Sequence, residues 1–343
     1  MFMNRLKLRW EAGCHVCVGL DTVADKIPPH LFSKSGVALN LEEALLFQLQ
    51  SVVDETKNVA CAFKPNFGFY ASMPYFLGYR VLAGVINFIH NTAPAVPVIL
   101  DGKWNDIGNS SERYAFAALD RQVFGADAVT VNPYLGGGAI SPFMEMKGGD
   151  DGKTILSRDT GVLILCRTSN LDAAEIQDMP VAVSYTQLRE LGFSREEIRG
   201  FRGSGCCQVL PSQDCSPLEA CNFGIPLYLW IAILVSKKWN KHHNCGLVVG
   251  ATVPEQLRNV RVIVGDDVPI LIPGVGKQGG KIEEIVPAGM NSLGAGMLIN
   301  NSSGILSASS GPDFAEKAGE VATKMNDDIK KAIAATRVVA RSN

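Results

Sequence analysis

Short apolar runs alternate with longer amphipathic stretches along most of the chain. The apolar runs are four to seven residues long, are rich in Val, Ile, Leu and Cys, and lie at residues 14–20, 59–64, 97–101, 127–131, 161–166, 246–250, 269–272 and 296–300. They show little alternation of apolar and polar positions, which is typical of parallel strands that are buried on both faces. The stretches between them have helical spacing and lie at residues 41–57, 75–90, 112–124, 183–199, 254–262 and 314–335.

Eight such strands, with helical segments after most of them, predict a single (β/α)8 TIM barrel over residues 1–343. The length of the chain fits one such domain, because α/β barrels often exceed about 250 residues. An open, doubly wound sheet is the alternative, since the pattern of a sequence does not reveal whether the sheet closes.

One segment, residues 200–222, does not follow this alternation. It contains four cysteines, two prolines and three glycines, which predicts a loop insertion in the fifth crossover. The residues that a zinc site here would use are Cys206, Cys207, Cys215 or Cys221 with His242 or His243. Because their spacing matches no CxxC…CxxC or CxxC…HxxxH pattern, we favour a surface loop with free thiols.

The composition narrows the class of protein. Thirty-two Lys and Arg against 34 Asp and Glu leave a net charge of −2, which makes nucleic acid or an anionic membrane a poor partner. The longest apolar stretch, residues 223–236, is shorter than the roughly 20 residues that cross a bilayer, and it predicts a buried helix. No apolar run near residue 1 resembles a signal peptide, and the nine cysteines are an odd number, so we expect a cytoplasmic protein with reduced thiols.

Charged residues gather where the first three predicted strands end. These residues are Asp21, Lys64, Asp101, Lys103 and Asp106. In an α/β barrel the chemistry takes place at the C-terminal ends of the strands, so these groups are candidates for an active site. Asp101 and Lys103 are two residues apart and would point to the same side of an extended chain. Alternating Lys and Asp can neutralise one another in a dry site; a structural ion-pair network is the alternative reading.

Polar residues and a glycine-rich turn follow other strands. Asn66 follows the second strand, Ser169 the fifth, and Ser302 and Ser303 the eighth. The turn at 273–280, PGVGKQGG, fits the dinucleotide pattern G-x-G-x-x-G, but no acidic residue stands about 20 positions later. We therefore expect it to offer backbone N–H groups to an anion, as the loops after the last two barrel strands commonly do.

Together these segments resemble the longer branch of the orotidine 5′-monophosphate decarboxylase family. The matching pieces, in the family's order, are VGLD (18–21), FKPNFGFY (63–70), ILDGKWNDIGNS (99–110), DAVTVNPYLG (127–136), RTSN (167–170), GLVVGAT (246–252) and PGVGKQGG (273–280). The resemblance implies a carboxy-lyase that converts orotidine 5′-monophosphate (OMP) to UMP and CO2 in de novo pyrimidine biosynthesis. It also implies that the reaction uses no metal and no other cofactor.

The resemblance assigns roles to individual residues. It implies a catalytic array of Lys64, Asp101, Lys103 and Asp106, with Lys103 as the proton donor. The residues that it assigns to substrate binding are Asp21, Asn66, Ile107, Ser110, Ser169, Pro273, Gln278, Gly279, Ser302 and Ser303. Among these, the resemblance implies that Asp21 contacts the ribose together with Lys64, that Ser169 reads the pyrimidine amide edge, and that Gln278 reaches the phosphate. Asp106, Ile107 and Ser110 match residues that the family contributes to the neighbouring subunit's site, so the resemblance implies a homodimer.

One departure from the family concerns the phosphate. The family shows an arginine where this chain has Ser303, and no arginine lies between Arg261 and Arg337. Lys277, beside Gln278, is a candidate for partial replacement of that cation. The departure leaves open a weakened or non-catalytic nucleotide-binding relative. A Mg²⁺-dependent sugar-phosphate lyase of the same barrel superfamily and a nicotinamide dehydrogenase are further alternatives.

Overall fold

The computed structural model describes residues 1–36, 40–145, 160–201, 208–209, 221–276 and 279–342. Eight parallel strands form one sheet in the order β2-β1-β11-β10-β9-β5-β4-β3. These strands are β1 (Val16–Gly19), β2 (Ala60–Lys64), β3 (Ile99–Trp104), β4 (Ala128–Val131), β5 (Gly161–Arg167), β9 (Cys245–Val249), β10 (Ile270–Ile272) and β11 (Met297–Asn301). Each of the eight predicted apolar runs contains or overlaps one of them.

The two ends of this sheet, β2 and β3, meet through isolated bridges. Phe63 pairs with Val98 and Asn66 pairs with Asp101, both in parallel. The backbone N–H of Asp101 donates to the Pro65 carbonyl over 2.9 Å. The sheet is therefore a nearly closed barrel, so the predicted TIM barrel is confirmed and the open sheet is wrong.

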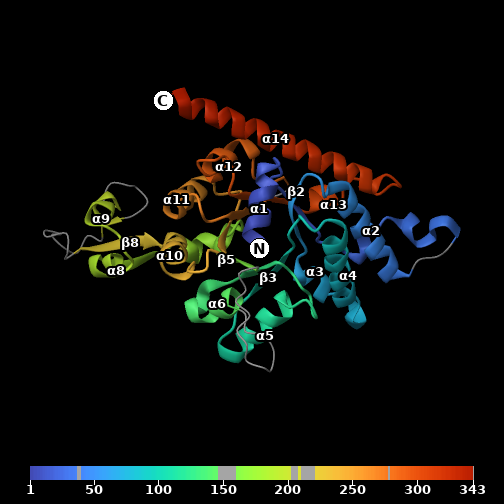
Figure 1. The fold of residues 1–343 in the computed structure, drawn as a ribbon, viewed down its shortest axis with the longest axis horizontal. Helices are drawn as coiled ribbons and strands as arrows, with labels where there is room; N and C mark the ends of the chain where they lie inside the picture. The colour runs from blue at the N-terminus through green and yellow to red at the C-terminus, as the bar shows by residue number, and fades with distance from the viewer. Residues whose placement is uncertain (37–39, 146–159, 202–207, 210–220, 277–278, 343) are drawn as a thin grey trace.

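Helices surround the barrel between successive strands (Figure 1). The longer ones are α2 (Leu41–Thr56), α4 (Leu77–Thr92), α5 (Gly108–Leu119), α6 (Gly137–Met144), α10 (Leu227–Leu234), α11 (Pro254–Val264), α12 (Ile282–Gly289) and α14 (Phe314–Ser342). Short helices and 3₁₀ turns at the strand ends are η1 (Ala24–Lys26), η2 (Pro29–Gly36), α3 (Phe67–Ala71), η3 (Pro74–Phe76), η4 (Pro133–Leu135), η5 (Leu171–Ala173), α7 (Ala174–Gln177) and α13 (Ser303–Leu306). The last helix, α14, packs against α2 and α12.

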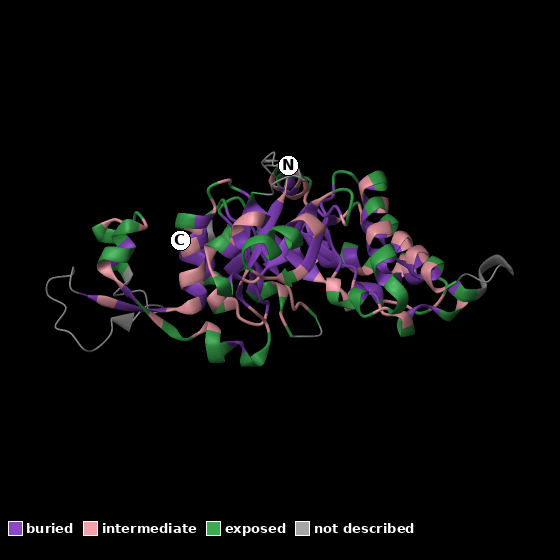
Figure 2. Ribbon diagram, turned by 90° about the horizontal axis from the view of Figure 1, so that it is seen from below, coloured by how far each residue is buried: buried purple, intermediate pink, exposed green. Residues whose placement is uncertain are grey.

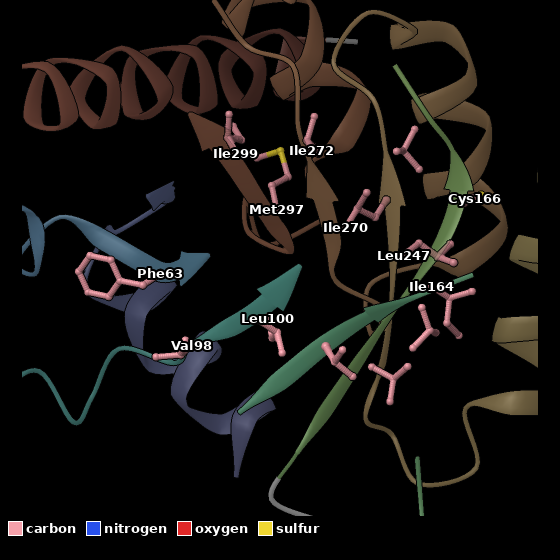
Figure 3. Close-up of a cluster of buried hydrophobic side chains, with 14 of the residues drawn as sticks. Phe63, Val98, Leu100, Ile164, Cys166, Leu247, Ile270, Ile272, Met297 and Ile299 are labelled. Carbon is pink, nitrogen blue, oxygen red and sulfur yellow. The ribbon is translucent and has the colours of Figure 1, made fainter. Parts of the chain in front are cut away.

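Strand residues alternate between two buried layers. One layer packs the strands against the surrounding helices, and Figure 3 shows part of it, including Ile270 and Ile272 of β10 beside Met297 and Ile299 of β11. Figure 2 shows the buried residues concentrated on the strands and the exposed residues on the outer helices. Strands buried on both faces explain why the sequence shows continuous apolar runs.

The second layer fills the barrel interior. Its twelve buried residues are Phe2, Leu6, Cys14, Cys17, Cys61, Ala62, Ile99, Ala128, Leu163, Val248, Leu271 and Leu298. Two of them belong to α1 (Phe2–Glu11), a helix that the sequence analysis did not predict. Gly161 at the start of β5 makes room for it, because a Cβ there would lie 2.2 Å from the Phe2 ring. We conclude that α1 closes the N-terminal end of the barrel.

The crossover from β5 to β9 carries a second, smaller sheet, which projects from the barrel on the left of Figure 1. Its strands pair antiparallel in the order β6-β8-β7. The three strands and the two helices between them are β6 (Pro180–Ser184), α8 (Tyr185–Glu190), α9 (Arg195–Phe201), β7 (Gln208–Val209) and β8 (Asn222–Pro226). The predicted helical stretch at 183–199 therefore begins within a strand, and the insertion is more than a loop.

Two expectations about this region need correction. The run 223–236, predicted as one helix, begins in β8 and becomes helical only at Leu227, after Pro226; the π-helical turn Val235–Trp239 continues it. Most of the predicted loop 200–222 lies outside the described residues, including Cys206, Cys207 and Cys215. Cys221 is described and is buried, not on a surface loop as expected.

The described residues contain neither a metal cluster nor a membrane-spanning helix. His242 Nε2 lies 2.6 Å from Glu145 Oε1. Within the described ranges, no three His, Cys, Asp or Glu side chains gather as a metal site would need. Across the same ranges, every helix is too short or too polar to cross a membrane.

Candidate active site

A cavity of about 620 Å³ opens where the barrel strands end. Its walls come from the segments that follow β1, β2, β3, β5, β10 and β11, so it lies at the C-terminal end of the barrel. Nine of the predicted site residues line it: Asp21, Lys64, Asn66, Asp101, Lys103, Ser169, Pro273, Ser302 and Ser303. Residues that are up to 282 positions apart in the sequence, from Asp21 to Ser303, thus share one site.

Asp101 is the centre of a charged network in this cavity. Lys64 Nζ donates to one carboxylate oxygen of Asp101 over 2.8 Å, and Lys103 Nζ donates to the other over 2.6 Å. Lys64 and Asp101 are buried, whereas the Lys103 side chain is 45% exposed. Of these two lysines, Lys103 is the one that remains accessible to a ligand, and the carboxylate that holds it is also bound by the buried Lys64.

The electrostatics keep this network ionised. Burial disfavours the charged carboxylate of Asp101, but the ammonium groups of Lys64 and Lys103 outweigh it and hold the pKa of Asp101 well below its usual range. Burial likewise disfavours the charged Lys64, but the carboxylates of Asp101 and Asp21 raise the pKa of Lys64 above its usual value. At neutral pH the cavity wall therefore carries fixed opposite charges, and two of them, on Lys64 and Asp101, are buried.

The backbone of β3 departs from a regular strand where it carries this network. The pairing of β3 with β4 shifts register between Leu100 and Trp104, and Lys103 has a left-handed backbone with φ of +50°. Such a conformation costs a non-glycine residue of order 1 kcal/mol or more and is often found at functional sites. Asp101 and Lys103 do meet, as the sequence analysis expected, but through a bulge and not through the alternation of an extended strand.

Thr130 of β4 stabilises this bulge, although it was not among the predicted site residues. Its hydroxyl donates to Asp101 Oδ1 over 2.8 Å and accepts from the backbone N–H of Lys103 over 2.9 Å. Thr130 is 1% exposed and is the one polar residue between the valines of β4. A single polar residue within an apolar strand is a sign of a functional role in the sequence, but the partners of Thr130 lie on another strand and could not be named from it.

Two buried acceptors in the cavity wall have no donor. Among the described residues, Asp21 Oδ1 and Asn300 Oδ1 find no hydrogen-bond partner. A buried acceptor without a partner costs about 1–3 kcal/mol, so a ligand that brings hydroxyl or N–H groups would relieve both. Asn300 ends the last predicted strand but was not among the predicted site residues. Tyr70, whose hydroxyl donates to the Leu20 carbonyl over 2.7 Å, fixes the chain beside Asp21.

The loop after β5 positions Ser169. Arg167 is buried, and its Nε and Nη2 donate to the two carboxylate oxygens of Asp178 over 2.7 and 3.0 Å. The backbone N–H of Thr168 donates to Gln177 Oε1 over 2.7 Å. Gly250 at the end of β9 allows the loop to approach, because a Cβ there would lie 2.7 Å from Ser169 Cα. The Ser169 backbone is thus fixed at the cavity wall by contacts on both sides.

Comparison with known proteins assigns the family. The model of the orotidine 5′-phosphate decarboxylase / HUMPS family matches residues 15–206, more than half of the chain. An orotidine 5′-phosphate decarboxylase of Janthinobacterium sp. (strain Marseille) is 35% identical over 334 residues, which cover 97% of this chain and 99% of that protein. The chain belongs to this family.

Other relatives agree over nearly the full length. An orotidine 5′-phosphate decarboxylase of Cellvibrio japonicus (strain Ueda107) is 35% identical over 332 residues, which cover 96% of this chain and 98% of that protein. The solved structure of Leishmania donovani OMP decarboxylase is 25% identical, superposes with a TM-score of 0.65, and covers 96% of this chain and 98% of that one. The resemblance to the OMP decarboxylase family that the sequence motifs indicated is therefore confirmed.

Three residues that the family pattern assigns to a shared site lie away from the cavity wall of their own chain. Asp106, Ile107 and Ser110 are absent from the residues that line the described cavity. Asp106 Oδ1 accepts from the backbone N–H of Ile107 over 2.7 Å, and the Ile107 side chain is 65% exposed. Their role across a subunit interface stays a prediction, since the structure contains one chain.

The glycine-rich turn after β10 differs from what we expected. Gly276 and Gly279 have φ of +88° and +94°, which glycine readily adopts. The N–H of Gly279 donates to the Gly276 carbonyl over 2.9 Å, and that of Gly280 donates to the Gly274 carbonyl over 3.2 Å. These two N–H groups are therefore engaged within the turn and do not point to an anion. Gly279 does not line the described cavity, and the predicted residues Lys277 and Gln278 lie outside the described residues.

Proposed function

We propose that this chain decarboxylates OMP to UMP and CO2 in de novo pyrimidine biosynthesis. The observation that carries the proposal is the Lys64–Asp101–Lys103 network, ionised and half enclosed, in the cavity of a barrel of the OMP decarboxylase family. The named relatives that align over nearly the whole chain give it independent support.

The chemistry requires electrostatic stabilisation. When the bond from C6 of the pyrimidine to the carboxylate breaks, CO2 leaves and the electron pair stays on C6, where no adjacent carbonyl delocalises it. A fixed positive charge next to C6 lowers the energy of this carbanion, and a fixed charge costs no reorganisation during the reaction. Lys103 supplies that charge and then transfers a proton from Nζ to C6, which yields UMP.

Asp101 keeps Lys103 in position. Its carboxylate binds the Lys103 ammonium over 2.6 Å and remains ionised because Lys64 balances it on the other side. It also brings a negative charge close to the substrate carboxylate, and this repulsion is relieved as CO2 departs. Asp106 is proposed to complete the array.

The rest of the cavity binds the nucleotide. The buried, unpartnered acceptor of Asp21 suits a ribose hydroxyl, and Ser169 suits the amide edge of the pyrimidine. Ser302 and Ser303, which line the cavity, are proposed to bind the phosphate. The family pattern assigns the same role to Gln278, which lies outside the described residues. Binding energy at the phosphate, far from C6, can be used to close the site and so accelerate the reaction. Asn66 and Pro273 complete the proposed binding wall.

We further propose a cytoplasmic homodimer in which each site takes residues from both chains. The placement of three residues supports this, because none of Asp106, Ile107 and Ser110 lines the described cavity of its own chain and Ile107 is 65% exposed. Asp106 and Ser110, on either side of it, would enter the site of the second chain.

The decisive test follows the absorbance of OMP after addition of the pure protein. We expect turnover that EDTA does not change and that Lys103→Ala abolishes, while UMP still binds to the variant. Lys241→Ala, an exposed lysine away from the cavity, is the matched control and should retain full activity. Absence of turnover in the wild-type protein despite tight UMP binding would support the non-catalytic relative, and loss of turnover with EDTA would support a Mg²⁺ enzyme.

A further inference from the structure

The phosphate end of the proposed site lacks the cation that the family pattern places at position 303. A serine occupies that position, and it lines the cavity together with Ser302. A hydroxyl can donate a hydrogen bond to a phosphate but cannot balance its charge. A cation from another position near this end would therefore be needed to bind a dianionic phosphate ester well.

The charges in the cavity wall identify a candidate. The charged residues that line the described cavity are Lys26, Lys64, Lys103, Asp21 and Asp101. Without Lys26, two lysines face two aspartates and the formal charges cancel. Both of those lysines also bind Asp101, so neither is available as a free charge. Lys26 is the source of the cavity's net positive charge among the described residues.

Lys26 lies in the loop that neighbours Ser303. Strands β1 and β11 are adjacent and parallel, so the loops that follow them leave the barrel side by side. The two segments are in close contact at Gly19, where a Cβ would lie 2.9 Å from Ser302 Cα. The 3₁₀ turn η1, which ends at Lys26, is the next element after β1, and Lys26 and Ser303 line the same cavity.

The turn is anchored while the side chain of Lys26 is exposed. The N–H of Lys26 donates to the Val23 carbonyl over 3.0 Å, and the next residue, Ile27, is 5% exposed. Before the turn, the buried hydroxyl of Thr22 donates to Gln48 Oε1 over 3.1 Å. Lys26 itself forms no ion pair with another described residue. Its ammonium is thus presented from a fixed backbone and is free to bind a ligand.

We propose that Lys26 binds the phosphate of the nucleotide and replaces the cation missing at Ser303. The inference rests on the proposed function, because it assumes that the substrate is a nucleoside monophosphate with its phosphate at the β1–β11 side of the cavity. An ammonium is a point charge without the bidentate geometry of a guanidinium, so the replacement is incomplete.

Calorimetric titration with UMP and with uridine tests this without requiring turnover. We expect Lys26→Ala to weaken UMP binding about ten- to a hundredfold, the range for a hydrogen bond to a charged group. Binding of uridine, which has no phosphate, should change less than about twofold. Lys26→Arg should retain UMP binding, and Lys241→Ala should match the wild-type protein for both ligands.

A second substitution reverses the defect. Ser303→Arg in the Lys26→Ala background should restore most of the UMP affinity, because it returns a cation to the position where the family has one. Equal weakening of UMP and uridine by Lys26→Ala, or unchanged UMP affinity, overturns the inference, as does a wild-type protein that binds UMP no better than uridine. A wild-type protein that prefers UMP but does not decarboxylate OMP refutes the proposed function alone.

Discussion

The hydroxyl of Thr130 offers a sharp test of how the network is held. Thr130→Val keeps the shape of the side chain and removes only the group that links Asp101 Oδ1 to the Lys103 N–H. The Asp101 carboxylate loses one of its three side-chain hydrogen bonds, which costs about 1.5–3 kcal/mol of stability. The part-buried N–H of Lys103 loses its acceptor, which costs about 1–3 kcal/mol more. Because valine gains some burial energy, we expect a net loss of about 2–4 kcal/mol in the free energy of unfolding, measured by urea denaturation.

The catalytic effect should exceed what stability explains. With its N–H released, the strained backbone of Lys103 can relax and shift Nζ away from C6. A displacement near 1 Å can cost about a hundredfold in rate, so kcat for OMP should fall roughly ten- to a hundredfold with KM changed less than about threefold.

A control variant separates an effect on the position of Lys103 from a general loss of stability. Thr56→Val removes a different buried hydroxyl, which donates to the Val52 carbonyl within α2. It should destabilise the protein and leave kcat unchanged. If Thr130→Val retains kcat within twofold of the wild-type value, Thr130 does not position Lys103 and our account of the bulge is wrong.

Three further outcomes are expected. Gly250→Ala should push the Ser169 loop outward and weaken UMP binding about tenfold, which calorimetry measures; unchanged affinity would show that the loop is not tightly packed. Mixing inactive Lys103→Ala and Asp106→Ala subunits should restore part of the activity after subunit exchange, whereas no recovery would place each site within one chain. The pKa of His15 is lowered to about 4, mainly by burial and to a smaller extent by the positive charges of Lys330 and Arg337. As the pH falls, His15 is protonated in the unfolded chain at a higher pH than in the folded protein, so acid favours unfolding. The free energy of unfolding should fall by up to about 3 kcal/mol between pH 6.5 and 4, and by much less in His15→Asn.

The sequence predicted the barrel because its strands are buried on both faces. Such strands are continuous apolar runs in the sequence. Eight of them with helices between left two sheet arrangements to consider, a closed barrel and an open, doubly wound sheet. The same signal failed at residues 223–236, where a run of apolar residues contains both the strand β8 and the helix α10. Apolar character alone does not separate a buried strand from a buried helix, and Pro226 marks the boundary only in hindsight.

The site was partly predictable for a related reason. Parallel strands end at the same rim of a barrel, so charged residues directly after them had to converge, and Asp101 with its two lysines did. Thr130 and Asn300 were missed because each is a polar residue within or at the end of a strand whose significance depends on a neighbouring strand. Lys26 lies five residues beyond the strand-end aspartate, and only the folded loop shows that it reaches the cavity.

The helix that closes the base of the barrel has a consequence for synthesis of the protein on the ribosome. Trp10 of α1 donates its indole N–H to the Met297 carbonyl of β11, 287 residues further along the chain. Phe2 and Leu6 share the interior with Leu298 of the same strand. While the intervening chain is being translated, the apolar face of α1 has no β11 to cover it. Because contacts this distant in sequence form slowly, we expect closure of the barrel to be a late step and α1 to need protection from aggregation until then.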